Sequence, residues 1–357
     1  MPSWLATFRR RLLAWYARHQ RTLPWRGTRD PYRVWVSEIM LQQTQVATVE
    51  SYFPRFLSAF PTIQSLADAP EEQVLRLWEG LGYYRRARQL HAAAKCVVAE
   101  YRGVFPTDIE AVRKLPGIGR YTAGAILSIA FDQRQPILEA NTFRLLARLQ
   151  AYRGDPRSSD GAAQLWSFAE ELLPQRDVGT FNQALMELGS LICKPRAPSC
   201  GMCPVAELCP TRAQGLQEEI PPPARKPTME SIHVAAAVIR RRNEVLLVRN
   251  PDGERWAGLW DFPRFELAGV STSPTPERLA ELVTERTGLT VQIERPLTTL
   301  KHGVTRFRIT LDAWLGQPTG GRLRRSPWSP RWVKVSELDN LPLSVTGRKL
   351  VKVVSAL

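Results

Sequence analysis

The sequence lacks the marks of several protein classes. Its longest apolar stretch lies near residues 122–131, far short of the roughly 20 residues that a membrane-spanning helix needs. It has no internal repeat, no glycine period and no sustained heptad pattern, which excludes collagen-like and coiled-coil architectures. The basic segment 1–20 contains neither a clean apolar run nor a small-residue cleavage site. We therefore expect an amphipathic helix there, not a signal peptide, and a cytoplasmic protein.

Cysteine is scarce but clustered. The chain has five cysteines in 357 residues, and four of them follow the pattern Cys-x6-Cys-x2-Cys-x5-Cys: Cys193, Cys200, Cys203 and Cys209. Without an export signal, such a cluster indicates metal or cluster ligation before disulfides. Zinc ribbons usually have two Cys-x2-Cys pairs, whereas four cysteines in one short loop suit a 4Fe–4S cluster. We predict one 4Fe–4S cluster with a structural role, with structural zinc as the alternative. Cys96 is expected to be a buried apolar residue.

The composition is that of a globular protein with a basic surface. Hydrophobic residues make up 44% and charged residues 23% of the chain. Lysine and arginine number 49 against 34 acidic residues, a formal net charge of +15. This balance favours a polyanionic partner, either nucleic acid or a membrane surface, over a neutral one. A basic surface that is merely solvated stays open as the alternative.

The hydrophobic pattern divides the chain into two domains. Residues 1–215 show apolar residues at three- and four-residue spacing, which predicts an all-α domain. Residues 216–230 are polar and proline-rich, as in an extended linker. Residues 231–357 mix β-branched strand patterns with a helix, so we expect an α+β domain. The predicted helices are 8–19, 34–49, 71–81, 85–101, 122–131, 142–149, 163–172, 180–191 and 276–287; the predicted strands are 233–239, 245–249, 290–294, 305–314 and 331–335.

A glycine-containing turn lies between two predicted helices at residues 115–125, Leu-Pro-Gly-Ile-Gly-Arg-Tyr-Thr-Ala-Gly-Ala. Gly117 and Gly119 permit positive φ and the close approach of a phosphate to free backbone N–H groups. A plain interhelical turn explains a Gly-x-Gly equally well. The flanking Leu-Pro and Thr-Ala-Gly favour a helix-hairpin-helix DNA-binding element.

Two glutamates are candidates for acid–base chemistry. Glu38 lies in the otherwise apolar helix pattern Trp-Val-Ser-Glu-Ile-Met-Leu, where partial burial would raise its pKa and make it a better proton donor near neutral pH. Glu139 stands at the predicted start of another helix, in Glu-Ala-Asn. A helix-start acid is also favoured by the helix dipole alone. The pattern by itself leaves a structural role open for both.

Taken together, these motifs resemble the MutY family of adenine DNA glycosylases, in the helix-hairpin-helix superfamily. The resemblance is carried, in family order from about residue 4 to 215, by the segments 35–46 and 80–84, the hairpin, the segment 181–189 and the four cysteines. It implies a helical glycosylase domain with an iron–sulfur loop and a C-terminal Nudix-like domain. It also implies a monomer that acts at the bacterial nucleoid on double-stranded DNA, where a mispaired adenine is flipped out and its glycosidic bond cut.

The resemblance assigns roles to residues. Glu38 matches the general acid and Glu139 the carboxylate that faces the sugar, where the family normally has aspartate; Asn141 supports that carboxylate. Tyr121 stands where lyase members have lysine, and a phenol forms no Schiff base, which implies a glycosylase without β-lyase activity. The remaining matches are Trp25, Arg26 and Glu187 around the adenine pocket, and Gln42, Gln43, Thr44, Leu81 and Tyr83 on the lesion side. Core packing is an equally good explanation for each aromatic residue.

The C-terminal domain carries a weaker form of the resemblance. The segment 256–263, Trp-Ala-Gly-Leu-Trp-Asp-Phe-Pro, is similar to the family's Nudix-like domain. The glutamate-rich metal-binding box is mostly lost at 281–289, so we predict binding without hydrolysis. At the family's Phe-Ser-His loop this chain has Val304-Thr305-Arg306, in which Thr305 keeps a hydroxyl.

Three functional hypotheses follow. The first is an adenine glycosylase that acts on adenine opposite 8-oxoguanine or guanine. The second is an endonuclease III-like pyrimidine glycosylase, which Tyr121 and the C-terminal domain disfavour. The third is a DNA-binding protein with degraded catalysis, suggested by Glu139 and the altered recognition loop.

Overall fold

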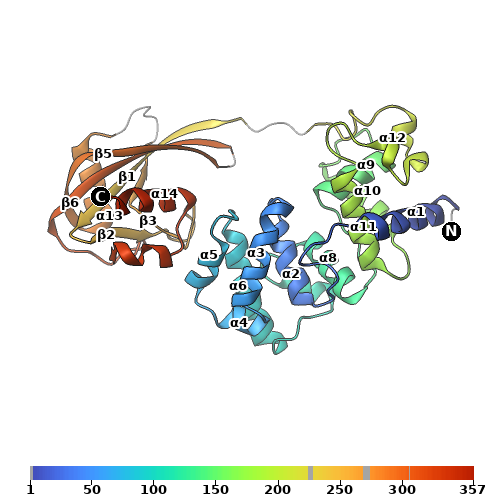
Figure 1. Cartoon of the computed structure of the whole chain (residues 1–357), viewed down its shortest axis with the longest axis horizontal. Helices are drawn as coiled ribbons and strands as arrows, with labels where there is room; N and C mark the ends of the chain where they lie inside the picture. The colour runs from blue at the N-terminus through green and yellow to red at the C-terminus, as the bar shows by residue number, and fades with distance from the viewer. Residues whose placement is uncertain (1–2, 224–227, 268–273, 305) are drawn as a thin grey trace. The chain divides into compact units, whose positions relative to one another are not determined.

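The computed structural model describes residues 3–223, 228–267, 274–304 and 306–357 (Figure 1). It contains two compact units. The first comprises residues 1–68 and 89–225, and the second comprises residues 69–88 and 226–357. Residues 69–88, which the sequence places in the helical domain, thus pack with the C-terminal part of the chain.

The first unit is helical, as predicted. Its elements are α1 (Ser3–His19), α2 (Pro31–Leu41), α3 (Val46–Ala59), α4 (Ile63–Asp68), most of α6 (Arg85–Tyr101), α7 (Ile109–Lys114), α8 (Arg120–Phe131), α9 (Ala140–Leu149), α10 (Ser159–Leu172), α11 (Val178–Leu191), two 3-10 turns at Cys200–Met202 and Ala206–Leu208, and α12 (Pro210–Ala213). Capping fixes several starts: Asp30 accepts from the backbone of Tyr32, and Ser158 accepts from that of Gly161.

One apolar cluster joins α1, α9, α10 and α11. Phe8, Leu12, Leu146, Phe181 and Leu188 are buried completely within it. Their three- and four-residue spacing places them on single helix faces, and each such side chain stabilises the fold by about 1.5–3 kcal/mol. This core lies beneath α9 and α11, and therefore supports the helices that present Glu139 and Glu187.

The single helix predicted at residues 34–49 is wrong. The structure has α2 and α3 there, separated by a turn in which Gln43 has a φ of 56°. That left-handed backbone ends a helix, and the apolar spacing on either side does not reveal it. The turn 42–45 that results projects polar side chains beside the end of α2.

The helix-hairpin-helix element is present as α7, a turn at 115–119 and α8. Gly117 has a φ of 78°, and a Cβ there would lie 2.8 Å from the Cβ of Gln89. Gly119 has a φ of −90° and open space at its Cβ position. Only Gly117 therefore uses the conformational freedom that we expected of both glycines.

The second unit is α+β, as predicted. Within its described residues, seven strands form a mixed sheet in the order β3-β2-β1-β6-β5, with β4 on β1 and β7 on β2. β1 and β6 are parallel, and the other pairs are antiparallel. The strands are β1 (Glu230–Arg241), β2 (Glu244–Arg249), β3 (Trp260–Asp261), β4 (Arg264–Glu266), β5 (Leu289–Val304), β6 (Phe307–Gly321) and β7 (Arg331–Lys334); the helices are α5 (Glu71–Trp78), α13 (Pro276–Thr287) and α14 (Val345–Ser355), with a 3-10 turn at Val335–Asn340.

Both faces of this sheet are buried. Along β1, Ala235 and Ile239 face a core that includes Leu279 and Val283 of α13. The alternate residues Ala236 and Val238 face a second core that contains Leu350, Val351 and Val354 of α14. The period of two places successive side chains on opposite faces, which explains the nearly continuous apolar run in β1.

Candidate active site and iron–sulfur loop

A cavity of about 420 Å³ lies in the first unit. It is lined from α2, α8, α9, α11 and the loop after α1, and its size suits a ligand as large as a base. Ten of the sequence-predicted residues line it: Trp25, Arg26, Glu38, Gln42, Gln43, Thr44, Tyr121, Glu139, Asn141 and Glu187. The fold thus gathers side chains from positions 25 to 187 around one space.

Glu38 and Tyr121 form a hydrogen-bonded pair in this cavity. Glu38 is buried, with 5% of its surface exposed, and the hydroxyl of Tyr121 donates to its Oε2. Burial raises the pKa of Glu38 to about 7, against the opposing effect of the Tyr121 hydrogen bond. Burial also raises the pKa of Tyr121 well above its usual value, so the phenol keeps its proton. Glu38 is therefore poised to donate a proton near neutral pH.

Glu139 caps the N-terminus of α9. Its Oε1 accepts from the backbone of Thr142 at 2.9 Å, and its Oε2 accepts from the backbone of Asn141 at 2.9 Å. The Asn141 side chain donates to Oε2 at 3.2 Å. Burial raises the pKa of Glu139, and these backbone hydrogen bonds act to lower it. The capping role that the sequence left open is real, and it fixes the carboxylate at the cavity wall.

Asn141 connects this carboxylate to the cysteine loop. Its Oδ1 accepts from Arg144 at 3.1 Å, and Arg144 also donates to the carbonyl of Cys193 at 2.6 Å. Gly189 of α11 packs against the same turn, since a Cβ there would lie 2.8 Å from the Asn141 carbonyl oxygen. The position of the Glu139 carboxylate thus depends on α11 and on the start of the loop.

Glu187 is a buried anion held by two arginines. Arg21 donates to both of its oxygens at 2.8 to 3.0 Å, and Arg26 donates at 2.6 Å. Burial alone would raise the pKa of Glu187, but the hydrogen bonds from Arg21 and Arg26 outweigh it and lower the pKa to about 2. This group stays ionised at neutral pH, in contrast to Glu38.

Sequence reasoning missed part of this wall. Arg21, Met186 and Ser190 line the cavity, and Met186 Sδ lies 3.6 Å from the Tyr121 hydroxyl. Ser190 lies about one helical turn from the predicted residue Glu187, so the helical period could have found it. Met186 is the direct neighbour of Glu187 in the chain. No signal marks Arg21, which reaches Glu187 only through the tertiary fold.

Three predicted residues lie elsewhere. Leu81 and Tyr83 belong to the second unit, where Tyr83 lines a cavity of about 770 Å³ together with Trp256, His302 and Val345. Leu81 is buried and Tyr83 is 46% exposed. Thr305 lies outside the described residues. Among the residues that are described, no cluster of three or more His, Cys, Asp or Glu side chains could hold a metal ion.

The four clustered cysteines line one small cavity of about 30 Å³, formed with α9 and the 3-10 turns. No disulfide joins them, and they do not converge as ligands of a single ion do. Arg148 donates to Cys193 Sγ at 3.3 Å. The donor set fits an iron–sulfur cluster. When bound, such a cluster would cross-link the loop through its four thiolate ligands.

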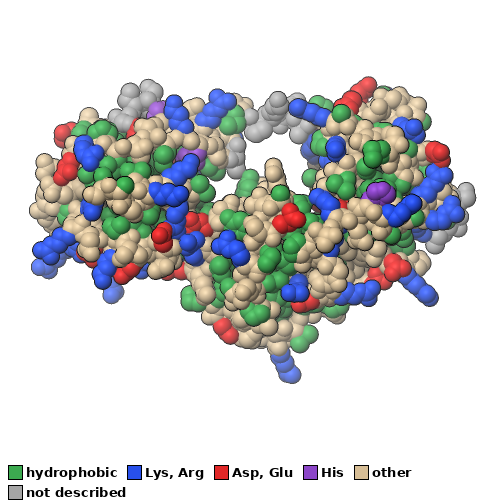
Figure 2. All heavy atoms as spheres, viewed as in Figure 1, with side chains coloured by type: hydrophobic (Ala, Val, Ile, Leu, Met, Phe, Trp, Pro, Cys, Tyr) green, Lys and Arg blue, Asp and Glu red, His purple; other side chains and the backbone are tan. Residues whose placement is uncertain are grey.

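Lysine and arginine side chains are spread over the visible surface of each unit, with acidic side chains between them (Figure 2). The basic charge is therefore not confined to one patch on this face. No helix in the part of the chain that the structure describes is long and apolar enough to cross a membrane.

Comparison with known families accounts for these features. Residues 36–171 match the HhH-GPD superfamily of base excision DNA repair proteins, residues 193–209 match the iron–sulfur binding domain of endonuclease III, and residues 234–353 match the NUDIX domain. The adenine DNA glycosylase of Homo sapiens is 34% identical over 98% of this chain and 74% of its own length.

This chain belongs to the adenine DNA glycosylase family. Members of this family are DNA glycosylases, enzymes of base excision repair. The adenine DNA glycosylase of Rattus norvegicus is 40% identical over 86% of this chain, and the match covers 61% of the rat protein. A thermostable thymine-DNA glycosylase structure is 29% identical, with a TM-score of 0.55, over 59% of this chain and 97% of its own. The predicted family, fold class and iron–sulfur loop are confirmed.

Proposed function

We propose that this protein hydrolyses the N-glycosidic bond of adenine opposite 8-oxoguanine or guanine in double-stranded DNA. The observation that carries the proposal is the pair of carboxylates in one cavity. Glu38 has a pKa of about 7 and can protonate a leaving base, while Glu139 is held by backbone N–H groups and can face the sugar. An acid for the leaving group and an anion for the oxocarbenium ion are the two requirements of glycosidic cleavage.

The rest of the cavity supports adenine as the leaving base. Protonation of a purine ring nitrogen by Glu38 turns a poor leaving group into a good one. The buried Glu187 anion holds Arg21 and Arg26 at the cavity wall, where their guanidinium N–H groups can donate to the edge of a flipped base. Water held near Glu139 and Asn141 would attack the sugar carbon and complete the hydrolysis.

We propose that the enzyme has no β-lyase activity. In the described residues no lysine lines the cavity, and Tyr121 occupies the wall beside Glu38. A Schiff base with the opened sugar requires an amine, and this cavity presents guanidinium, amide, phenol and carboxylate groups instead.

The larger cavity of the second unit is the proposed site for the base opposite adenine. His302 lines it, and both of its ring nitrogens are buried without a hydrogen-bond partner. An imidazole with both nitrogens unpartnered can hydrogen-bond to a base edge once the ring turns toward the cavity. Tyr83 at the same cavity carries an exposed ring on a φ of 46°, suited to stack in a gap between base pairs.

We further propose that the cysteine loop binds one 4Fe–4S cluster through Cys193, Cys200, Cys203 and Cys209, because four thiolates are the ligand set of that cluster. The protein would act as a monomer on the DNA of the bacterial nucleoid, in the cytoplasm. The formal net charge of +15 supports a DNA partner.

A substrate panel tests the function. Duplexes with A opposite 8-oxoguanine, A opposite G, T opposite G and A opposite T are incubated with the protein and analysed before and after hot alkali. We expect strand breaks at the mispaired adenine after alkali only, and no adduct trapped by borohydride. Breaks at thymine would favour the pyrimidine glycosylase. Binding to the 8-oxoguanine duplex without any breaks would favour the DNA-binding protein with degraded catalysis.

A further inference from the structure

Residues 69–88 belong to one domain by sequence and to the other by packing. By sequence they fall within the superfamily match at 36–171, and by packing they belong to the unit of residues 226–357. They comprise α5, the turn at 79–84 and the first residues of α6. The turn carries Tyr83, so whatever holds this segment against the C-terminal residues also holds Tyr83.

Polar contacts fix α5 along its length. Glu71 accepts from Arg249 at 2.9 Å, and Glu72 accepts from the Trp260 indole at 2.6 Å. At the other end of the helix, Arg76 donates to the Asp339 carbonyl at 2.8 Å. These contacts tie the helix to β2, β3 and the 3-10 turn, and they lead to a more buried ion pair just beyond the helix.

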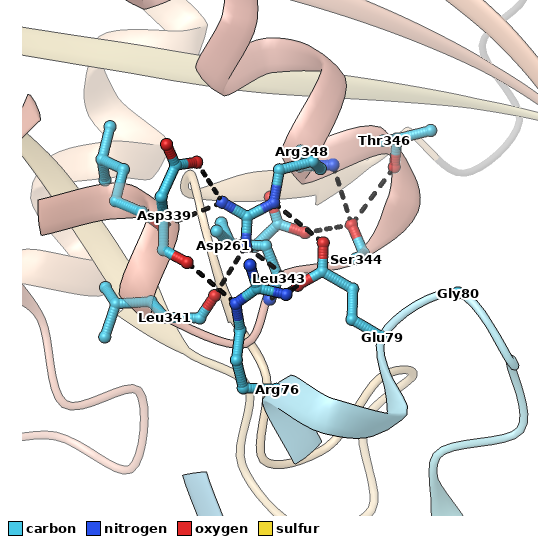
Figure 3. A network of polar contacts seen from close by, with 12 residues as sticks. Arg76, Glu79, Gly80, Asp261, Asp339, Leu341, Leu343, Ser344, Thr346 and Arg348 are labelled. Atoms are coloured by element: carbon cyan, nitrogen blue, oxygen red, sulfur yellow. Dashed lines mark hydrogen bonds and ion pairs between the residues drawn. The ribbon is translucent and has the colours of Figure 1, made fainter. Parts of the chain in front are cut away.

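That ion pair joins Glu79 to Arg348 of α14 (Figure 3). Arg348 Nε and one terminal nitrogen each donate to a Glu79 oxygen at 2.8 Å, in a bidentate arrangement. The two side chains are only 10% and 17% exposed. The guanidinium also donates to the carbonyls of Leu338 and Leu341 and to Asp339. Because these hydrogen bonds hold the planar Arg348 guanidinium in place, its bidentate contact fixes both the distance and the orientation of the Glu79 carboxylate.

Glu79 and Arg348 each lie close in sequence to residues that line the proposed opposite-base cavity. Glu79 directly precedes the turn Gly80-Leu81-Gly82-Tyr83, in which Gly80, Gly82 and Tyr83 all have positive φ. Arg86 stabilises this turn by donating hydrogen bonds to the carbonyls of Leu81 and Gly82. Arg348 lies in the first turn of α14, whose residues 345, 346 and 349 line the same cavity. The pair thus links the Tyr83 turn to α14, two segments that both supply lining residues of this cavity.

We propose that the Glu79–Arg348 pair is a positioning element that couples the base opposite adenine to the placement of the Tyr83 turn. A base held at α14 would fix the turn through the pair, and a base that is not held would leave the turn less constrained. Loss of the pair should then reduce discrimination between 8-oxoguanine and guanine, rather than binding to DNA in general. This inference rests on the proposed function.

The test compares Glu79→Gln, Arg348→Gln and the double variant with wild type and with Glu72→Gln. Glu72→Gln is the matched control, because it alters another contact of the same helix that lies away from the turn. One readout is the ratio of single-turnover rates for adenine opposite 8-oxoguanine and opposite guanine. The other is the ratio of dissociation constants for the same duplexes with an uncleavable 2′-fluoroadenosine. Thermal unfolding shows which variants remain folded.

We expect each single variant to lower both ratios by about 10-fold, within the usual range of coupling between two sites. The double variant should lose no more than the worse single variant, because each single change already breaks the pair. Glu72→Gln should keep the wild-type ratios.

Unchanged ratios in folded Glu79→Gln would overturn the inference and leave the glycosylase proposal intact. If wild type releases no adenine, the glycosylase proposal fails, and the binding ratios alone still decide on the pair. Should both single variants unfold, the pair is a fold-stabilising contact and the inference is wrong.

Discussion

The hydroxyl of Tyr121 donates a hydrogen bond to the carboxylate of Glu38 inside the cavity of the helical unit. This hydrogen bond links α8, which follows the hairpin turn, to α2, which carries the candidate acid Glu38. It stabilises the ionised form of Glu38 against burial, which favours the neutral form. The balance leaves the pKa of Glu38 at about 7.

This balance predicts the pH dependence of adenine release. An acid with a pKa of about 7 is protonated below that value, so the single-turnover rate should be high in mild acid and fall as pH rises through 7. Replacing Tyr121 by Phe removes the hydrogen bond that lowers the pKa of Glu38, so the fall should move to higher pH. A profile that is flat between pH 6 and 9 in wild type would contradict the assignment.

Glu139→Gln should lower the single-turnover rate by about 100-fold or more, because the charge that stabilises the oxocarbenium ion is lost. Glu139→Asp should keep activity, because aspartate is both an anion and a better N-cap than glutamate. Aspartate keeps two accepting oxygens, so thermal unfolding of Glu139→Asp should change little. Glutamine places an amide NH2 where Oε2 accepts from Asn141, so Glu139→Gln should unfold at a somewhat lower temperature. A Glu139→Gln enzyme with the wild-type rate would show that the carboxylate only caps the helix.

The cysteine loop predicts a brown protein with about four irons and matching sulfide per chain. Cys203→Ser should lose the cluster or most of the soluble yield. Cys96→Ser is the matched control, since Cys96 lies in α6 outside the loop, and it should keep full iron content. Anaerobically prepared wild type that contains stoichiometric zinc and no sulfide would count against the cluster.

The hairpin turn gives a contrast between two glycines. Gly117→Ala forces a side chain onto a φ of 78° and against Gln89, and should cost about 1–3 kcal/mol of the free energy of unfolding. Gly119→Ala meets open space at an ordinary φ and should stay within about 0.5 kcal/mol of wild type. Chemical denaturation of both variants measures the difference. Equal losses would mean that the turn differs from the one described.

The sequence alone predicts the features that depend on local pattern. The cysteine spacing, the helices 85–101 and 276–287, and the position of Glu38 on an apolar helix all follow from neighbours a few residues away. The family resemblance, and not periodicity, predicted the ten site residues that line one cavity.

The features that sequence reasoning missed depend on distant parts of the chain. Arg21 reaches Glu187 across 166 positions, and Arg348 reaches Glu79 across 269. No local pattern records such a pairing. Position in the chain places residues 69–88 in the helical domain, whereas the structure shows them in contact with β2, β3 and α14. The break at Gln43 was hidden because apolar spacing continues on both sides of it.

The most direct test of the central claim is the adenine-release rate of Glu38→Gln on the duplex with 8-oxoguanine, measured under single-turnover conditions beside its binding constant. Glutamine fills the same volume and can accept from Tyr121, but it has no acidic proton to give. The account predicts that release is lost while binding stays close to wild type, because phosphate contacts dominate affinity for DNA. A wild-type rate in a folded Glu38→Gln protein would remove Glu38 from the mechanism and contradict the account.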